Sequence, residues 1–162
     1  MNGTPPQRSE PKTFDLAVIH DCCSSPFDLH NCVPSGHCLS HARLRHLRES
    51  ERIVVTDASV PVGLTAYKRA TSEIRVVHEL LLDRTLTGRD ATRITDALLS
   101  ALEMVAQQDG VGCLTFLLRY GIVIAPFEER GYTSLVLDGR GVWLQRKLGW
   151  LGWCETRSVH QH

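Results

Sequence analysis

The residue best placed to do chemistry is Glu79, which stands inside an apolar run over residues 74–82 that is typical of a buried strand. A carboxyl group buried among apolar side chains holds its proton more tightly, which suits a general base working near neutral pH. Glu73 and His78 are the nearest substitutes for that role. The purely structural alternative is an ion pair between Glu79 and an arginine. Because side chains alternate along a strand, Glu79 should share a face with Val77 and lie opposite His78.

A polar turn over residues 84–90 follows this strand, and helical spacing then resumes as far as Gln108. The apolar positions recur at intervals of three and four: Ile94, Ala97, Leu98, Ala101, Leu102 and Val105. The spacing predicts a helix that begins near Asp90 or Thr92 and ends before Gly110. The first turn of a helix leaves backbone N–H groups free, so this junction is a place where an anion can bind.

A second group of chemically capable residues lies between His20 and His41, where Cys and His are unusually dense. These residues are His20, Cys22, Cys23, His30, Cys32, His37, Cys38 and His41. Tetrahedral zinc prefers such ligands, but the spacing matches no standard zinc motif. We therefore predict no metal, and a zinc-stabilised interaction protein built on residues 20–41 is kept as an alternative.

The remaining segments predict one mixed α/β (α+β) domain over residues 13–155, after a disordered tail at residues 1–12. The expected elements are a strand at 14–19, a helix capped by Ser40 and ending at Arg48, a hairpin with strands at 52–56 and 60–70, a strand at 113–118, a helical turn, and a strand pair ending near Leu148. In the second hairpin strand, Val62, Leu64 and Ala66 should share one face.

In this order, the elements from Arg52 to Leu148 resemble the acetyl-CoA-binding half of the GNAT acyltransferase superfamily. The resemblance implies a mostly antiparallel central sheet with a split between its fourth and fifth strands and helices on both faces. In that family the fourth strand ends at a bulge whose backbone pairs with the pantetheine arm. A glycine-rich turn, Q/R-x-x-G-x-G/A, then surrounds the pyrophosphate at the start of the next helix.

The resemblance implies an acyl-CoA site at the end of the fourth strand and in the turn after it. Its residues would be Leu80, Leu81 and Leu82 at the bulge, and Thr87, Gly88, Arg89, Asp90, Ala91, Thr92 and Arg93 at the phosphates. Gly88 is the one glycine in this turn. Asp90 would repel a phosphate, so Arg89 and Arg93 must compensate for it. The alternative is an ordinary turn in which Asp90 is the helix N-cap.

The second family signature is a helix of the form N-x-x-A-x-x-F-Y-x-x-x-G-F, whose Tyr protonates the departing thiolate. Anchored on Gly131, the signature places Tyr120 at its Asn position and Phe127 at its Tyr position. Phe127 has no proton to donate, so Tyr120 becomes the candidate acid, with simple packing as its alternative. Gly131 is expected to end the helix in a left-handed conformation.

The resemblance thus implies an N-acetyltransferase that transfers an acetyl or other acyl group from acetyl-CoA to an amine, with Glu79 and Tyr120 as catalytic residues. The altered motifs keep a second hypothesis open, a GNAT-like binding or regulatory domain without catalysis. Acidic and basic residues balance at 18 each, which gives no electrostatic case for nucleic acid or an anionic membrane. A polar N-terminus and the lack of a long apolar run predict a cytoplasmic protein with free thiols. An apolar stretch at residues 148–153 would dock on the sheet or form a homodimer contact.

Overall fold

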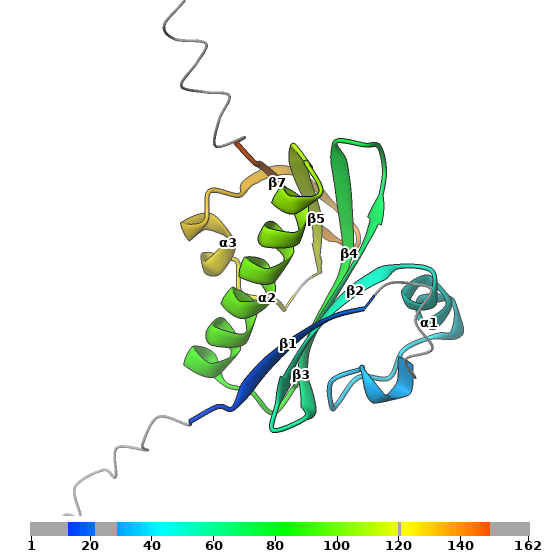
Figure 1. Cartoon of the computed structure of the whole chain (residues 1–162), viewed down its shortest axis with the longest axis vertical. Helices are drawn as coiled ribbons and strands as arrows, with labels where there is room; N and C mark the ends of the chain where they lie inside the picture. Colours follow the sequence, from blue (N-terminus) through cyan, green and yellow to red (C-terminus); the bar gives the residue numbers. More distant parts are fainter. Residues whose placement is uncertain (1–12, 22–28, 120, 150–162) are drawn as a thin grey trace, which may run out of the picture.

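The computed structural model describes residues 13–21, 29–119 and 121–149, which form a seven-stranded sheet with the order β1-β2-β3-β4-β5-β7-β6 (Figure 1). The strands are β1 (Leu16–Asp21), β2 (Glu51–Asp57), β3 (Val60–Arg69), β4 (Ile74–Leu82), β5 (Cys113–Arg119), β6 (Thr133–Asp138) and β7 (Gly141–Lys147). The helices are α1 (His41–Arg48), α2 (Gly88–Gln108) and α3 (Ala125–Glu129), with one 3-10 turn, η1 (Leu29–Asn31).

One parallel strand pair joins two antiparallel halves of the sheet. Strands β1 to β4 form an antiparallel meander, and β7 pairs antiparallel with both β5 and β6. Strands β4 and β5 run parallel, and their four paired positions extend from Ile74–Cys113 to Val77–Phe116. Beyond that last pair the two strands separate. The predicted fold class is confirmed: a mostly antiparallel sheet, split between its fourth and fifth strands, with helices on both faces.

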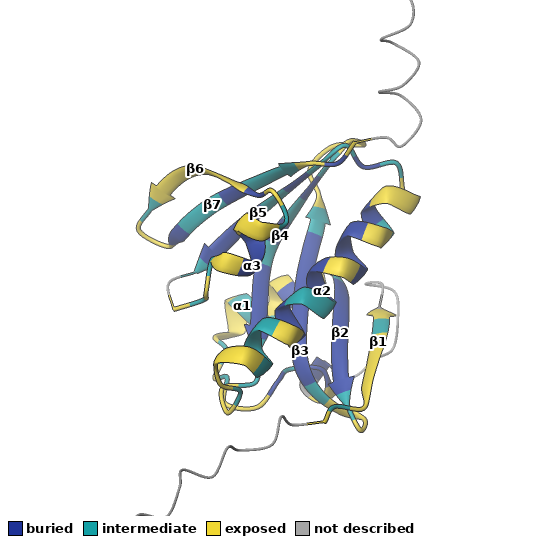
Figure 2. Cartoon of the chain, turned by 90° about the vertical axis from the view of Figure 1, so that its left-hand side faces the viewer, coloured by how far each residue is buried: buried dark blue, intermediate teal, exposed yellow. Residues whose placement is uncertain are grey.

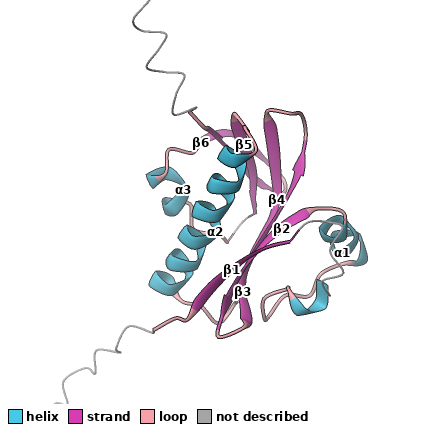
Figure 3. Ribbon diagram, in the orientation of Figure 1, coloured by secondary structure: helices cyan, strands magenta, loops and turns pink. Residues whose placement is uncertain are grey.

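Each face of the sheet has its own apolar core. Helices α2 and α3 cover one face, and α1 packs on the other (Figures 1 and 3). The larger core joins the inner face of α2 to the sheet, and the smaller one joins Leu47 of α1 to Val54, Leu64 and Leu81. Helix α2 lies close to the sheet at Gly63, where a Cβ atom would stand 2.6 Å from Ile94 Cγ2.

Two β-bulges overturn the side-chain faces that simple alternation predicts. In the β3–β4 ladder, Ala66 pairs with Glu79 but Tyr67 pairs with Val77, so His78 is an extra residue. Val77 therefore packs toward α2, whereas His78 and Glu79 both contact the α1 side. The prediction that Glu79 lies on the face of Val77 and opposite His78 was wrong.

The other bulge lies at Val62 of β3, opposite the β2 residues Val55 and Thr56. Val62 belongs to the α2 core, whereas Leu64 and Ala66 belong to the α1 core. The prediction that these three side chains share one face was therefore also wrong, and for the same reason.

The helix ends follow the local sequence signals. Ser40 is the N-cap of α1 and its Oγ accepts a hydrogen bond from Arg43 N at 3.3 Å, as expected. Helix α2 begins one turn earlier than predicted, because Thr87 is its N-cap and Asp90 lies inside the first turn. Asp90 is therefore not the N-cap. Gly131 has a φ of +87°, in agreement with its predicted role after α3.

The core of the domain is buried, whereas the edge strand β6 is exposed. Phe116, Phe127 and Tyr132 pack edge to face, with ring centroids 5.2 to 5.5 Å apart. In contrast, Leu135, Val136 and Leu137 of the edge strand β6 are exposed (Figure 2). Within the described part of the chain, none of the helices has the length and apolar composition that crossing a membrane requires.

Candidate active site

A cavity of about 490 Å³ opens where β4 and β5 separate. It is bounded by the end of β4, the start of α2, the segment before α3, and side chains from the α1 side of the sheet. The lining residues are His37, Arg43, Leu80, Leu81, Leu82, Asp83, Arg84, Leu86, Gly88, Ala91, Thr92, Thr95, Arg119, Gly121, Ile122, Val123 and Pro126. Apolar walls with a few convergent charged groups are typical of a small-molecule site.

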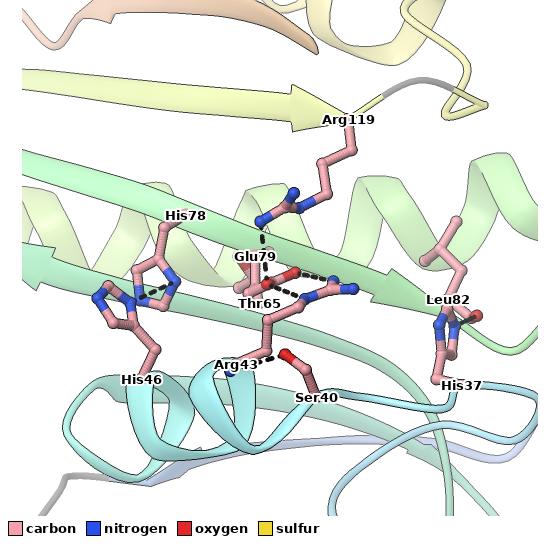
Figure 4. Close-up of polar contacts among 9 residues, drawn as sticks. All are labelled: His37, Ser40, Arg43, His46, Thr65, His78, Glu79, Leu82 and Arg119. Atoms are coloured by element: carbon pink, nitrogen blue, oxygen red, sulfur yellow. Dashed lines mark hydrogen bonds and ion pairs between the residues drawn. The ribbon is translucent and has the colours of Figure 1, made fainter. Parts of the chain in front are cut away.

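Two arginines of this cavity converge on Glu79 (Figure 4). Arg43 Nε and Nη2 each donate to a different Glu79 carboxylate oxygen at 2.7 Å, which makes a two-pronged pair. Arg119 Nη2 donates to Glu79 Oε1 at 3.4 Å. The Glu79 side chain is 2% exposed, so the carboxylate is buried and held by two cations.

The local structure explains how these three residues meet. The bulge at His78 turns Glu79 toward α1, and Thr65 Oγ1 donates to the Glu79 carbonyl oxygen. Arg43 lies in the first turn of α1, while Arg119 is the last residue of β5. The hydrogen bonds to Glu79 raise the pKa of the Arg43 guanidinium above its ordinary value. Glu79 therefore lies in a cationic environment rather than the apolar one that its sequence neighbours suggest.

A histidine pair lies farther back along β4, outside the cavity lining. A hydrogen bond of 2.8 Å joins His78 Nε2 to Ser50 Oγ. The other ring nitrogen of His78, Nδ1, lies 3.5 Å from His46 Nδ1. Burial, followed by the nearby His46, lowers the pKa of His78 to about 4. His78 is consequently neutral at physiological pH, and neither of its ring nitrogens is open to the cavity.

His37 closes one wall of the cavity, because its Nε2–H donates to the backbone carbonyl of Leu82. That carbonyl lies at the end of β4, within the segment that the resemblance assigns to the pantetheine arm. The contact ties the loop before α1 to the open part of β4.

Six of the ten residues predicted to bind the cofactor line the cavity. Leu80, Leu81, Leu82, Gly88, Ala91 and Thr92 line the cavity, and Thr95 extends the same face of α2 by one turn. Thr87, Arg89, Asp90 and Arg93 do not line it, and the Arg93 guanidinium lies 5.0 Å from the centre of the Phe14 ring. Sequence analysis missed Arg43 and Arg119, whose partner Glu79 lies 36 and 40 residues away in the chain.

The other candidate acid–base residues are less favourably placed or not described. Phe127, at the position of the family's tyrosine, is fully buried in the aromatic core. Tyr120 lies outside the described residues, so its role stays a prediction. Glu73 precedes the paired end of β4 and is exposed, at the opposite end of the strand from the cavity.

The Cys/His segment gives no support to a metal site where it is described. Cys22 and Cys23 lie outside the described residues, and Cys32, Cys38 and Cys113 are free thiols. No three His, Cys, Asp or Glu side chains gather as a metal-ligand set within residues 13–21, 29–119 and 121–149.

No protein-family model matches this sequence, and a search of curated proteins finds no match either. Solved structures do match the fold. Ard1 from Thermoplasma volcanium has a TM-score of 0.64 at 12% identity, covering 83% of this chain and 99% of that one. A GNAT family acetyltransferase from Elizabethkingia anophelis with acetyl-CoA bound has a TM-score of 0.60 at 9% identity, covering 82% and 98%.

N-acetylglutamate synthase from Neisseria gonorrhoeae, complexed with coenzyme A and N-acetyl-glutamate, has a TM-score of 0.60 at 16% identity. That match covers 86% of this chain but 36% of the synthase. The identities are low, whereas the agreement in fold extends over most of the chain. The order of the strands, the parallel β4–β5 pair and the split after it place this chain in the GNAT fold.

Proposed function

We propose that this chain is an acyltransferase that binds acetyl-CoA or another acyl-CoA and transfers the acyl group to an amine. The observation that carries the proposal is the separation of β4 and β5 after Val77 and Phe116, with a cavity at that point. Two of the structures with the same fold hold acetyl-CoA or coenzyme A, which supports the assignment.

The cofactor would lie between the end of β4 and the start of α2. Leu80 to Leu82 supply the strand end along which the pantetheine arm would run, and backbone N–H groups of the first turn of α2 would donate to the pyrophosphate. Gly88 has a φ of +26° and no heavy atom within 4 Å of the position a Cβ would take, so a ligand can approach the backbone there. Arg89 and Arg93 lie outside the cavity lining, so their positive charges would act on the phosphates only from a longer distance.

The reaction would be a direct transfer in the split. The amine nitrogen would attack the thioester carbonyl, a C–N bond would form and the C–S bond would break, the nitrogen would lose one proton, and the departing coenzyme A thiolate would take up one proton. Backbone N–H groups near Leu80 to Leu82 would polarise the carbonyl. Glu79 as base and Tyr120 as acid remain proposals, and both carboxylate oxygens of Glu79 already accept hydrogen bonds from arginine N–H groups.

A second proposal, a GNAT-like binding domain without catalysis, rests on one observation. Phe127 stands where the family has its proton donor, and it is completely buried. Turnover of acetyl-CoA with any amine contradicts this second proposal, whereas binding without turnover across an amine panel supports it.

Calorimetric titration with acetyl-CoA and with free coenzyme A tests the main proposal. Ala91→Phe should abolish binding, because Ala91 lines the cavity from α2. Gln107→Phe makes the same change at an exposed site near the other end of α2 and should bind as the original chain does. A folded protein with no affinity for either ligand would disprove the proposal.

A further inference from the structure

The charges around Glu79 do not balance. Two guanidinium groups, from Arg43 and Arg119, contact one carboxylate, which leaves a surplus of one positive charge. The arginine side chains are 33% and 38% exposed, and both line the cavity, whereas Glu79 is buried behind them. A ligand in the cavity therefore meets these two cations rather than the Glu79 carboxylate, and the other charged lining residues, Asp83 and Arg84, have opposite charges.

The hydrogen-bonding capacity of Arg119 is also incompletely used. Its single contact with Glu79 is long, at 3.4 Å, and its Nε is buried and makes no hydrogen bond to any of the described residues. A buried donor without an acceptor destabilises the folded state. An anionic group of the ligand would neutralise the surplus charge through the guanidinium groups that line the cavity.

This cationic pair is separate from the expected phosphate position. Arg43 belongs to α1, which covers the face of the sheet opposite α2 (Figure 1). Figure 4 shows Arg43 and Arg119 approaching Glu79 from two sides, well before the end of β4 at Leu82. The start of α2, where the pyrophosphate would bind, follows Leu82. The α1 end of the cavity is thus left for the acceptor.

The following inference rests on the proposed function. We propose that the acceptor amine carries a carboxylate, and that Arg119 and Arg43 bind this carboxylate while Glu79 holds the two guanidinium groups in place. A planar carboxylate matches the fork of an arginine, with two parallel N–H···O bonds. Because the cavity of about 490 Å³ must also hold the acyl end of the cofactor, the part of the acceptor that enters it is about the size of an amino acid. Arg43 and Arg119 are specificity residues, and Glu79 is a positioning residue.

Paired acceptors test this assignment in a thiol-release assay with acetyl-CoA. The pairs are L-alanine and L-alaninamide, L-phenylalanine and L-phenylalaninamide, and 4-aminobutyrate and butylamine. The last pair has amines of similar basicity, so any difference there reports the carboxylate itself. In at least one pair, we expect kcat/KM for the carboxylate member to exceed that of its partner about tenfold or more, since charge-assisted bidentate bonds are strong.

Arg119→Gln is the informative variant, because Arg43 still pairs with Glu79 and the fold should be retained. It should raise KM for the carboxylate member about tenfold and reduce the preference, while Arg119→Lys, which keeps the charge without the fork, should lie between. The matched control is Arg45→Gln, which removes an equal charge from an exposed site of α1 outside the cavity. It should keep the preference of the original chain.

A binding measurement separates this inference from the acyltransferase proposal. Ligand-observed NMR with L-phenylalanine, L-phenylalaninamide, 4-aminobutyrate and butylamine needs no turnover, and the two carboxylates should give the stronger signals, reduced in Arg119→Gln. Acetyl-CoA binding with equal use of both members of every pair would overturn the carboxylate inference and leave the proposed function intact. An equal loss for both members in Arg119→Gln would likewise show a merely structural arginine. No affinity for acetyl-CoA, together with a retained preference for carboxylates, would overturn the proposed function alone.

Discussion

Arg43 of α1 and Glu79 of β4 form a two-pronged ion pair, with both N···O distances at 2.7 Å, across 36 residues of chain. The pair joins the first turn of α1 to the centre of the sheet, beside the opening between β4 and β5. It therefore couples the stability of the α1 side to the geometry of the candidate active site.

Loss of Arg43 should destabilise the protein. Arg43→Gln leaves a buried carboxylate with only the longer contact to Arg119, so we expect the free energy of unfolding to fall by about 2–4 kcal/mol. Urea denaturation monitored by circular dichroism measures this. Arg45→Gln on the same helix should change stability by less than about 0.5 kcal/mol. Equal effects of the two variants would mean that the ion pair does not stabilise the fold.

Glu79→Gln should distinguish a positioning residue from a general base. If Glu79 only holds the arginines, the variant raises KM for the acceptor, and the acidic limb of the kcat/KM pH profile persists. If Glu79 is the base predicted from its place in the strand, kcat falls and that limb disappears. A pH profile with acetyl-CoA and the best acceptor of the panel decides between the two roles.

His78 should make the protein less stable in mild acid. Its folded pKa of about 4 lies below the ordinary 6.5, so the unfolded chain binds more protons between these values. The stabilising effect of neutral His78 is complete above about pH 6.5 and is lost as pH falls toward 4. The charged groups that act on it are His46, Glu79, Lys68 and Arg119.

The free energy of unfolding should therefore fall less in His78→Asn than in the original chain when the pH is lowered from 7.5 to 4.5. We expect the two decreases to differ by about 1–3 kcal/mol. Denaturation curves at both pH values measure it. His41→Asn, on an exposed residue at the start of α1, is the control. An unchanged pH dependence in His78→Asn would show that another group is responsible.

Asp90→Asn should tighten the binding of coenzyme A. Asp90 lies in the first turn of α2 without capping it, so its negative charge opposes a phosphate there. Two like unit charges about 4 Å apart repel each other by about 1 kcal/mol in water, and Asp90 lies outside the cavity lining, so we expect an affinity gain of up to about fivefold. Calorimetry at low salt measures the gain, and Glu129→Gln, on α3, should produce none. Weaker binding in Asp90→Asn would contradict the phosphate position at this turn.

Gly63→Ala should destabilise the protein by displacing α2. The added Cβ would lie 2.6 Å from Ile94 Cγ2 and 2.9 Å from Leu98 Cδ1, so these side chains or α2 itself must shift away from β3. Overpacking of this kind costs about 1–3 kcal/mol. Gly139→Ala adds the same methyl group where no heavy atom lies within 4 Å, and should leave the thermal midpoint almost unchanged. Similar midpoints for the two variants would argue against tight α2 packing.

The sequence by itself determined the elements and their order. Ser40 capped α1, the 3.6-residue spacing of apolar positions identified α2 through Gln108, and Gly131 ended α3 in a left-handed conformation. These features depend on contacts within a few residues of each other, which a linear pattern records. The order of elements resembled that of the GNAT superfamily, and this resemblance implied the sheet and its split.

Only the tertiary structure decided which side chains meet at the site. The bulge at His78 reversed the predicted face of Glu79, because a single extra residue shifts the alternation of a strand without any mark in the apolar pattern. Arg43 and Arg119 reach Glu79 from elements far apart in the chain, and their approach depends on how α1 and β5 pack against β4. Glu79, which looks like an isolated carboxylate in an apolar strand, is therefore a buried residue that pairs with two arginines from other elements of the fold.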